Sequence, residues 1–337
     1  MRTSFVRRGL LALVTIALAA GLAACGSSSS SSSSATSTTS SASSSAAASI
    51  PTSTNGGTAT PASSGPGVGK PAIVIGDKNF EEEYVLGSLY QEALAAKGYK
   101  VTLKGNIGSS ELIYKALTSG QIDMYPEYTG TFLTAIANDN NPPRSAAQTY
   151  ALAQAFAEKH GYMLLSQTPF ADSDVLTATK AFATAHGLKT VADLKKLGHF
   201  KLGAAPEFAT RYEGLLGLKK VYGLNPQFVP LAIGITYKAI DSGEVDVFDA
   251  FTTDPELLSG KYTPLTDTKG VFGFQNVAPV VKQSLLKAEG PAFEATINKV
   301  SSLLTLPAIQ KMNQAVAIDQ QSPASVAHQF LAANGLA

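Results

Sequence analysis

The sequence lacks several residues and patterns on which common functions depend. Tryptophan is absent, and only one cysteine and four histidines occur among 337 residues. A single cysteine excludes a disulfide within the chain. The histidines, at 160, 186, 199 and 328, do not have the spacing of metal ligands. The formal net charge is only +1 and no basic stripe is present, which argues against a nucleic-acid partner.

Only one long hydrophobic run is present, at the N-terminus. Three arginines precede apolar residues 10–22, which have the length of a secretory h-region and are too short for a comfortable membrane span. The following LAAC sequence, which ends at Cys25, resembles a lipobox. It implies that residues 1–25 are a lipoprotein signal peptide and that Cys25 carries a lipid anchor on the outer face of the cytoplasmic membrane. A plain signal peptide with an incidental cysteine is the weaker alternative, because the lone cysteine falls at the cleavage position.

Residues 26–70 consist almost entirely of Ser, Ala, Thr, Gly and Pro. Such a composition cannot bury a core, so we predict a disordered tether. Its glycine-rich end superficially resembles a phosphate loop, but it lacks the spacing and its lysine is followed by Pro71. Residues 71–337 remain, which is enough for one large domain or two coupled lobes.

A polar and aromatic segment at residues 123–131 (DMYPEYTGT) organises the chain. Acids, tyrosines and threonines of this mix converge where a small polar or charged ligand is held in a partly dry pocket. Just before it, residues 114–123 (YKALTSGQID) are echoed by residues 237–246 (YKAIDSGEVD). Both copies have the pattern of a helix end followed by a strand. The echo indicates two similar lobes facing each other across a cleft, although two amphipathic helix ends could also match by chance.

Strands and helices alternate along the chain. Residues 72–76 predict a strand, and a helix follows from Phe80 to about Lys97. The turn between them suits anion binding through backbone N–H groups and Lys78, although Lys78 could equally be a solvated surface lysine. We therefore expect an α/β fold of two lobes, each a mixed, mostly parallel sheet flanked by helices. The predicted division is 71–172 with 256–337 for lobe 1 and 173–255 for lobe 2.

Several motifs together resemble the osmoprotectant-binding proteins of ABC importers, the glycine betaine, choline and carnitine type. The motifs are GDKNFE at 76–81, YPEYTGT at 125–131, EF at 207–208 with Arg211, TD at 253–254 and PVV at 279–281. The resemblance covers essentially all of 71–337. It implies a type II-like periplasmic-binding-protein fold that closes on its ligand by hinge motion and docks on a membrane permease. No cofactor is implied, and we expect a monomer.

The resemblance also implies a ligand site. A quaternary ammonium group is caged by aromatic faces and negative groups, whereas a ligand carboxylate is met by cations and hydroxyls. By position, Tyr128 matches a cage tyrosine, and Lys78, Thr131 and Arg211 match the carboxylate side; an ion pair of Arg211 with Glu207 or Glu213 is the alternative. The whole expected ligand-binding set, which includes no metal ligand, is Lys78, Asn79, Tyr128, Thr131, Asp174, Arg211, Phe251, Thr252, Gln275 and Asn276.

Some positions depart from the betaine-binding pattern. Asp174, Phe251 and the pair Gln275–Asn276 stand where the family has cage tyrosines. We hypothesise that Asp174 faces the cationic end of the ligand. That would favour choline, another cationic amine or a polyfunctional zwitterion over glycine betaine. Asp174 could instead cap a helix or bridge the lobes.

Other functions fit the sequence less well. Asp123, Glu127, Asp246 and Asp254 could form a catalytic pair or a cation site, yet no nucleophile elbow or triad order is evident. Asp123 and Asp246 suit strand-end or helix-capping positions better. A binder of an amino acid or another polar or cationic nutrient on the same frame is the second interpretation. We expect an extracytoplasmic binding protein rather than an enzyme, with a small molecule and a permease as partners.

Overall fold

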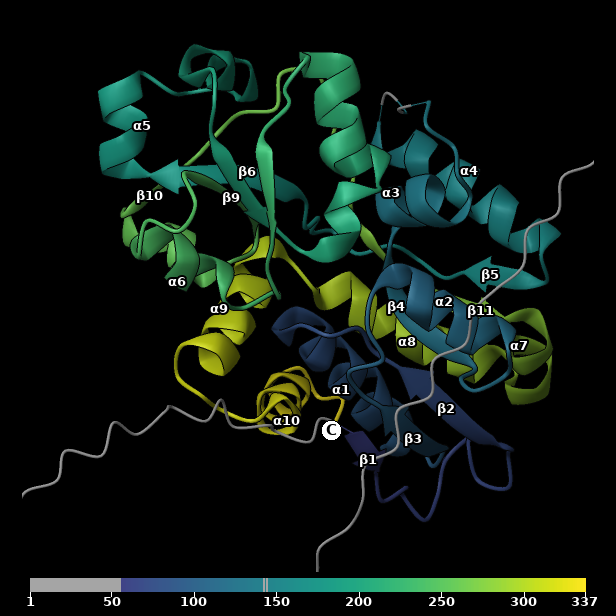
Figure 1. Cartoon of the computed structure of the whole chain (residues 1–337). Coiled ribbons are helices and arrows are strands. Elements are labelled where there is room, and N and C mark those ends of the chain that lie inside the picture. The colour runs from purple at the N-terminus through teal and green to yellow at the C-terminus, as the bar shows by residue number, and fades with distance from the viewer. Residues whose placement is uncertain (1–55, 142, 144) are drawn as a thin grey trace, which may run out of the picture. The chain divides into compact units, whose positions relative to one another are not determined.

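The computed structural model describes residues 56–141, 143 and 145–337, and its strands form two separate sheets (Figure 1). Each sheet is the centre of one lobe. The predicted signal peptide with Cys25, and the predicted tether up to residue 55, lie outside the described residues. Within the described part of the chain, no helix combines the length and the hydrophobicity needed to cross a membrane.

Lobe 1 is built on a six-stranded sheet with the order β1-β3-β2-β4-β11-β5. Strands β3, β2 and β4 are parallel neighbours, and the remaining pairs are antiparallel. Alternating residues of these strands face opposite sides, so both faces of the sheet carry apolar side chains that need cover. The strands are β1 (Gly56–Thr58), β2 (Ala72–Gly76), β3 (Lys100–Lys104), β4 (Met124–Tyr128), β5 (Tyr162–Leu164) and β11 (Val277–Lys282).

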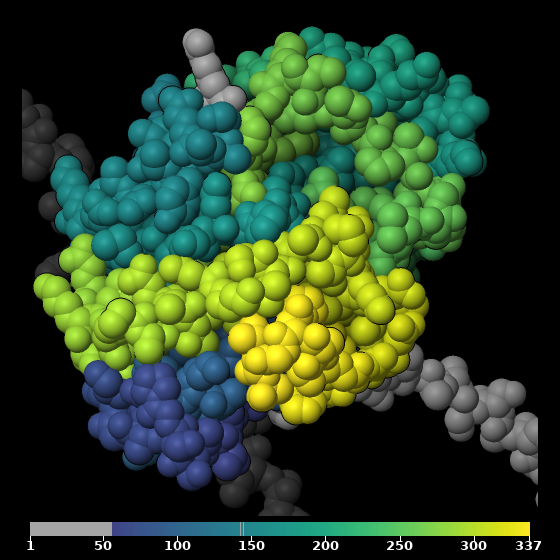
Figure 2. Space-filling model, turned by 180° about the vertical axis from the view of Figure 1, so that it is seen from behind, coloured from purple at the N-terminus to yellow at the C-terminus, as the bar shows by residue number. Residues whose placement is uncertain are grey.

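Helices cover both faces of this sheet, with a separate hydrophobic cluster on each. One face packs against α1 (Glu81–Ala95), α8 (Pro291–Leu303), α9 (Leu306–Ala317) and α10 (Pro323–Ala333). The other packs against α2 (Ser110–Thr118), α4 (Ala146–Lys159) and the short helices α3 (Thr129–Thr131) and η1 (Phe132–Ile136), while α7 (Gln283–Glu289) follows β11. Seen from behind, the C-terminal residues in yellow form one continuous surface (Figure 2).

Lobe 2 is built on a five-stranded sheet with the order β10-β6-β9-β7-β8. Here too parallel pairs, β9–β7 and β7–β8, adjoin antiparallel ones, so both sheets are mixed, as predicted. The prediction that they are mostly parallel is wrong, because antiparallel pairs are at least as frequent as parallel ones among the described strands of each lobe. The strands are β6 (Asp174–Thr179), β7 (Lys201–Ala204), β8 (Gln227–Pro230), β9 (Val247–Phe251) and β10 (Tyr262–Pro264). The helical segments are α5 (Lys180–His186), η2 (Val191–Leu197), η3 (Pro206–Ala209), η4 (Tyr212–Leu216), η5 (Leu218–Tyr222), α6 (Thr236–Asp241) and η6 (Pro255–Ser259).

The repeated sequence occupies equivalent places in the two lobes. Helix α2 leads into β4, and α6 leads into β9. In each lobe an aspartate lies between this helix and this strand. Asp123 accepts a hydrogen bond from the backbone N–H of Val74 at 2.9 Å, and Asp246 accepts one from the backbone N–H of Lys201 at 2.8 Å. Each aspartate thus fastens the start of its strand to the parallel strand beside it. The two acids have the strand-end role that the sequence predicts.

Lobe 2 extends beyond the predicted boundary at residue 255. Strand β10 pairs with β6, and the side chains of Leu265, Val271 and Phe272 lie in the core of lobe 2. The chain returns to lobe 1 only at about residues 273–276, where Ala171 and Asn276 form a bridge between the two crossing segments. The Asp254–Pro255 pair starts η6 instead, because proline at the first helical position begins a helix as readily as it ends a strand.

Residues 56–70, predicted as part of the tether, are ordered on lobe 1. Strand β1 pairs with β3, the N–H of Ala62 donates to the carbonyl of Ala95 at 2.9 Å, and that of Gly67 donates to Lys97 at 3.0 Å. The segment is held by backbone hydrogen bonds and close approach rather than by apolar side chains. The composition of the segment, which is rich in small residues, therefore did not predict that it is ordered.

We expect Gly67→Ala to destabilise lobe 1. A Cβ at this position would lie 2.3 Å from the backbone N of Tyr99 and 2.4 Å from its Cγ. Overpacking of this kind costs about 1–3 kcal/mol. Urea unfolding measures the effect, and Ser63→Ala, at an exposed position of the same segment, is the control. Equal stability of the two variants would contradict the packing of this segment.

Candidate functional site

A pocket of about 590 Å³, its solvent-open part included, lies between the two lobes and the crossing segments. It is lined by Lys78, Asn79, Phe80, Ser109, Ser110, Tyr128 and Thr131 of lobe 1, by Asp172 and Gln275 of the crossings, and by Asp174, Ala205, Glu207, Phe208, Arg211, Ile233, Asp249 and Phe251 of lobe 2.

The structure brings most of the predicted site residues to this pocket, and their contact with a ligand stays a prediction. Two of them do not line it. The Thr252 hydroxyl accepts from the N–H of Ser173 at 2.9 Å and donates to Asp172 at 3.2 Å. The Asn276 amide donates to the carbonyls of Thr168 and Phe170, both at 3.0 Å. Thr252 and Asn276 therefore hold the crossing segments together. Their positions in the sequence are the same for this role as for ligand contact, so the sequence alone could not separate the two roles.

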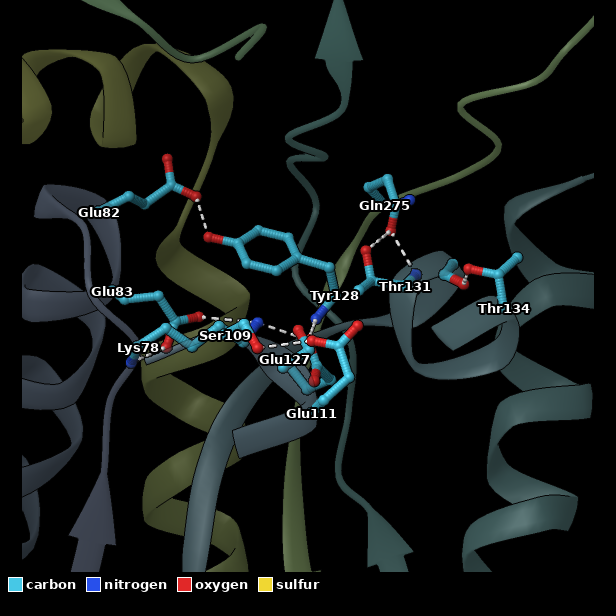
Figure 3. A network of polar contacts seen from close by, with 12 residues as sticks. Lys78, Glu82, Glu83, Ser109, Glu111, Glu127, Tyr128, Thr131, Thr134 and Gln275 are labelled. Carbon is cyan, nitrogen blue, oxygen red and sulfur yellow. Dashed lines mark hydrogen bonds and ion pairs between the residues drawn. The ribbon is translucent and has the colours of Figure 1, made fainter. Parts of the chain in front are cut away.

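Lys78 is buried and ion-paired. Its Nζ lies 2.5 Å from Oε1 of Glu127 on β4 and 3.5 Å from Oε1 of Glu83 on α1 (Figure 3). The same nitrogen lies 4.3 Å from the ring centroid of Tyr128, a cation–π contact. With 3% of its surface exposed, Lys78 is not a solvated surface lysine. Burial raises the pKa of Glu83 to about 8 in spite of Lys78, so Glu127 is the main carboxylate partner of the amino group.

Three aromatic rings stand in a row along the pocket. The ring of Phe80 stacks on Tyr128 with centroids 6.1 Å apart and on Phe251 with centroids 5.6 Å apart. The Tyr128 hydroxyl donates to Oε1 of Glu82 at 2.9 Å, which fixes the plane of the ring (Figure 3). Phe80 was not among the predicted site residues. Its place directly after Lys78 and Asn79, at the start of α1, is the signal that could have identified it.

Asp174 and Asp249 form a carboxyl pair on neighbouring strands. In the register of β6 and β9, Asp174 lies opposite Phe251 and Asp249 lies opposite Leu176, so both acids are on one face of the sheet. Asp174 starts a strand, which excludes the helix-capping alternative. Asp249, which the sequence did not single out, is 6% exposed, and its Oδ1 has no hydrogen-bond partner within the described residues.

The acid pair is poised to hold a proton. Burial and the nearby Glu213 raise the pKa of Asp174 to about 7, against the opposing charge of Arg211. Burial and the charge of Asp174 raise the pKa of Asp249 well above its usual value. Two carboxyls in contact cannot both ionise at low cost unless a cation joins them. The pair therefore suits a positively charged ligand group.

Arg211 binds a carboxylate of the opposite lobe. Its Nε and one terminal nitrogen donate to the two oxygens of Glu111 on α2, both at 2.9 Å, and Ser109 also donates to Glu111 at 2.6 Å. Burial raises the pKa of Glu111, but the hydrogen bonds and charge of Arg211 outweigh it and lower the pKa to about 2. The expected alternative partner, Glu213, lies farther away at 3.9 Å. Glu111 is 100 residues distant in the sequence, so no local pattern could pair it with Arg211.

A second polar link joins the lobes through Gln275. Its Oε1 accepts from the backbone N–H of Thr131 at 2.9 Å and from the Thr131 hydroxyl at 3.3 Å (Figure 3). Its amide nitrogen donates to Glu213 at 2.9 Å, and Thr134 donates to the same carboxylate at 3.0 Å. The predicted polar residue Gln275 thus positions both the site threonine and a buried acid of lobe 2. Among the described residues, no cluster of His, Cys, Asp and Glu is arranged to hold a metal ion.

Comparisons with known proteins agree on one family. The model for the "substrate binding domain of ABC-type glycine betaine transport system" matches residues 71–333. A glycine-betaine-binding protein of Pseudomonas aeruginosa is 31% identical over 270 residues, 76% of this chain and 86% of that protein. Glycine betaine-binding protein YehZ of Escherichia coli is 27% identical over 277 residues, 78% and 90% of the two chains.

A solved structure confirms the predicted two-lobed fold. The crystal structure of a glycine betaine/carnitine/choline ABC transporter protein is 26% identical to this chain, with a TM-score of 0.63. The match covers 78% of this chain and 99% of the other. The predicted architecture of two mixed α/β lobes is therefore that of a solved substrate-binding protein.

Asp174→Asn is expected to change how stability depends on pH. The folded-state pKa of Asp174, about 7, lies above its ordinary value of 3.8, so its protonated form stabilises the fold. This contribution is fully present below pH 3.8 and is lost as pH rises through about 7. Asparagine does not titrate. Relative to wild type, the variant should therefore gain stability by up to about 1.4 kcal/mol per pH unit across this window.

Urea unfolding at intervals from pH 4 to pH 8 measures the difference between wild type and Asp174→Asn. Asp319→Asn, at an exposed position on the surface, is the control. A difference between Asp174→Asn and wild type that stays constant with pH would contradict a raised pKa at Asp174.

Proposed function

We propose that this protein, which belongs to the family of substrate-binding domains of ABC-type glycine betaine transport systems, captures an organic cation of the quaternary-ammonium class between its lobes. As a member of this family, it is the substrate-binding component of an ABC importer. The family is one of transporter binding proteins and not of enzymes. The pocket serves to bind the ligand, and delivery to the membrane permease follows.

The observation that carries the proposal is the meeting of an aromatic row and a carboxyl pair in one pocket. Tyr128, Phe80 and Phe251 present ring surface, and Asp174 and Asp249 present a carboxyl pair that a ligand cation would allow to ionise. A trimethylammonium group has no N–H to donate, so it is stabilised by ring faces and nearby carboxylates rather than by hydrogen bonds. These five residues supply both features.

Ligands with a net positive charge fit this pocket best. The relatives' names include glycine betaine, carnitine and choline, and all share a quaternary ammonium group. Choline differs in having a hydroxyl where glycine betaine has a carboxylate. Because Asp172, Asp174, Glu207 and Asp249 all line the pocket, we propose that choline-type cations bind more tightly than glycine betaine.

A second candidate is a nutrient with a primary or secondary ammonium group, such as an amino acid or a polyamine. The unpartnered, buried Oδ1 of Asp249 favours it, because an N–H donor would satisfy this atom. The aromatic row favours the quaternary ligand. Competition between choline and an amino acid in one titration separates the two candidates.

Calorimetric titration of the protein with choline, glycine betaine and carnitine tests the proposal. Tyr128→Leu and Phe251→Leu should each weaken binding of the preferred ligand by about 1–2 kcal/mol, because an aliphatic side chain keeps the bulk and loses the cation–π attraction. Phe274→Leu, an exposed aromatic residue outside this pocket, is the control. The proposal would be abandoned if no quaternary ligand bound, or if both variants kept wild-type affinity.

We also propose that Cys25 anchors the protein by a lipid to the outer face of the cytoplasmic membrane. The basic and apolar leader and the LAAC sequence that ends at the only cysteine support this. In cells fed radiolabelled palmitate, the wild-type protein should take up label and sediment with membranes. Cys25→Ala should take up no label and leave the membrane fraction. A labelled Cys25→Ala protein would disprove this anchor.

A further inference from the structure

The pocket contains positive charge, but the protein's own carboxylates occupy it. Of the described residues that line the pocket, Lys78 and Arg211 are basic. Lys78 is ion-paired with Glu127, with Glu83 nearby, and Arg211 is held by Glu111. Each of these two basic groups therefore already has a carboxylate of the protein as its partner.

The geometry at Arg211 is that of a bound carboxylate ligand. Two parallel N–H donors of the guanidinium contact the two oxygens of Glu111, the arrangement by which arginine recognises a free carboxylate. The Ser109 hydroxyl gives Glu111 a further hydrogen bond from its own lobe. Glu111 comes from α2 in lobe 1, and Arg211 comes from lobe 2, so this carboxylate is placed at the meeting of the lobes.

We infer that Glu111 is a specificity-determining residue: its carboxylate takes the place of a ligand carboxylate on Arg211 and so selects organic cations that carry no carboxylate. This inference rests on the proposed function and names the substrate class of the same pocket. A zwitterion such as glycine betaine would have to displace Glu111 from Arg211, whereas choline would not.

The remaining charges of the pocket point the same way. Among the described residues, Asp174 and Asp249 form no ion pair with Lys or Arg, so a ligand cation meets uncompensated carboxyls there. A ligand carboxylate would lie among Asp174, Glu207 and Asp249 without a free cation to join it. Burying such a charge without a partner is costly. The pocket thus favours a positive ligand by attraction and disfavours a zwitterion by repulsion.

The contact could also act only as a latch that holds the lobes together. A latch and a specificity determinant give different results when Glu111 is neutralised. If the contact is only a latch, its loss weakens the binding of every ligand by the same factor. If Glu111 is a specificity determinant, its neutralisation releases Arg211. The affinity for ligands that have a carboxylate then rises relative to the affinity for ligands that lack one.

The test compares the Kd values of choline and glycine betaine for wild type, Glu111→Gln and Glu207→Gln, measured by calorimetry on the same preparation. Glu207→Gln is the matched control, because it removes one negative charge from the pocket wall but forms no hydrogen bond or ion pair with Arg211. In Glu111→Gln, the affinity for glycine betaine should rise about tenfold relative to the affinity for choline, because a charge-assisted hydrogen bond from Arg211 becomes available to the glycine betaine carboxylate. Adding Arg211→Ala to Glu111→Gln should remove this gain.

Each outcome decides between the hypotheses. A tenfold relative gain in Glu111→Gln, small in Glu207→Gln and absent in the double variant, would support the inference. An unchanged ratio of the two Kd values in Glu111→Gln, or an equal change in Glu207→Gln, would overturn it and leave the proposed function standing. If wild type binds neither choline nor glycine betaine nor carnitine, the proposed function fails, and the inference fails with it.

Discussion

The buried ion pair between Lys78 and Glu127 is the contact on which the pocket depends. It joins the turn after β2 to the end of β4, and Glu83 brings α1 to the same point. A buried pair of this kind is worth little as net stability, but removing one partner leaves an uncompensated charge. Its effect is therefore on geometry: it fixes the β4 end and with it the ring of Tyr128, which lies under the Lys78 amino group.

Apart from the stacking of Phe80 on Phe251, the described contacts that join the two lobes are polar, and the lobes do not share a hydrophobic core. Separate apolar clusters fill each lobe, while Glu111 with Arg211, and Gln275 with Glu213, reach from one side to the other. Polar contacts can be exchanged for water at modest cost, whereas a shared apolar core cannot. This division is suited to a protein that opens and closes around a ligand.

The two lobes and the segment around Tyr128 could be predicted from the sequence. The regular spacing of apolar residues and the repeated helix end are both visible in short stretches of the chain. Sequence reasoning found Asp174 and Gln275 through their positions in a known pattern. It missed Phe80 and Asp249, which join the pocket only when strands β6 and β9 and helix α1 come together. Contacts over long sequence distances, such as that of Glu111, are fixed by the fold and leave no local trace.

The ordered segment 56–70 has a mechanical consequence. It fastens the chain to lobe 1 through β1, and the final helix α10 also packs on lobe 1 against α1. Lobe 2 is thus an insertion in lobe 1, and the chain enters and leaves it through the crossing segments near Ala171 and Asn276. A restraint that acts through the N-terminal segment would hold lobe 1 still. Lobe 2 is then the half that moves, and it carries Arg211, Asp174 and Asp249 toward the rings of Phe80 and Tyr128 on the stationary lobe 1.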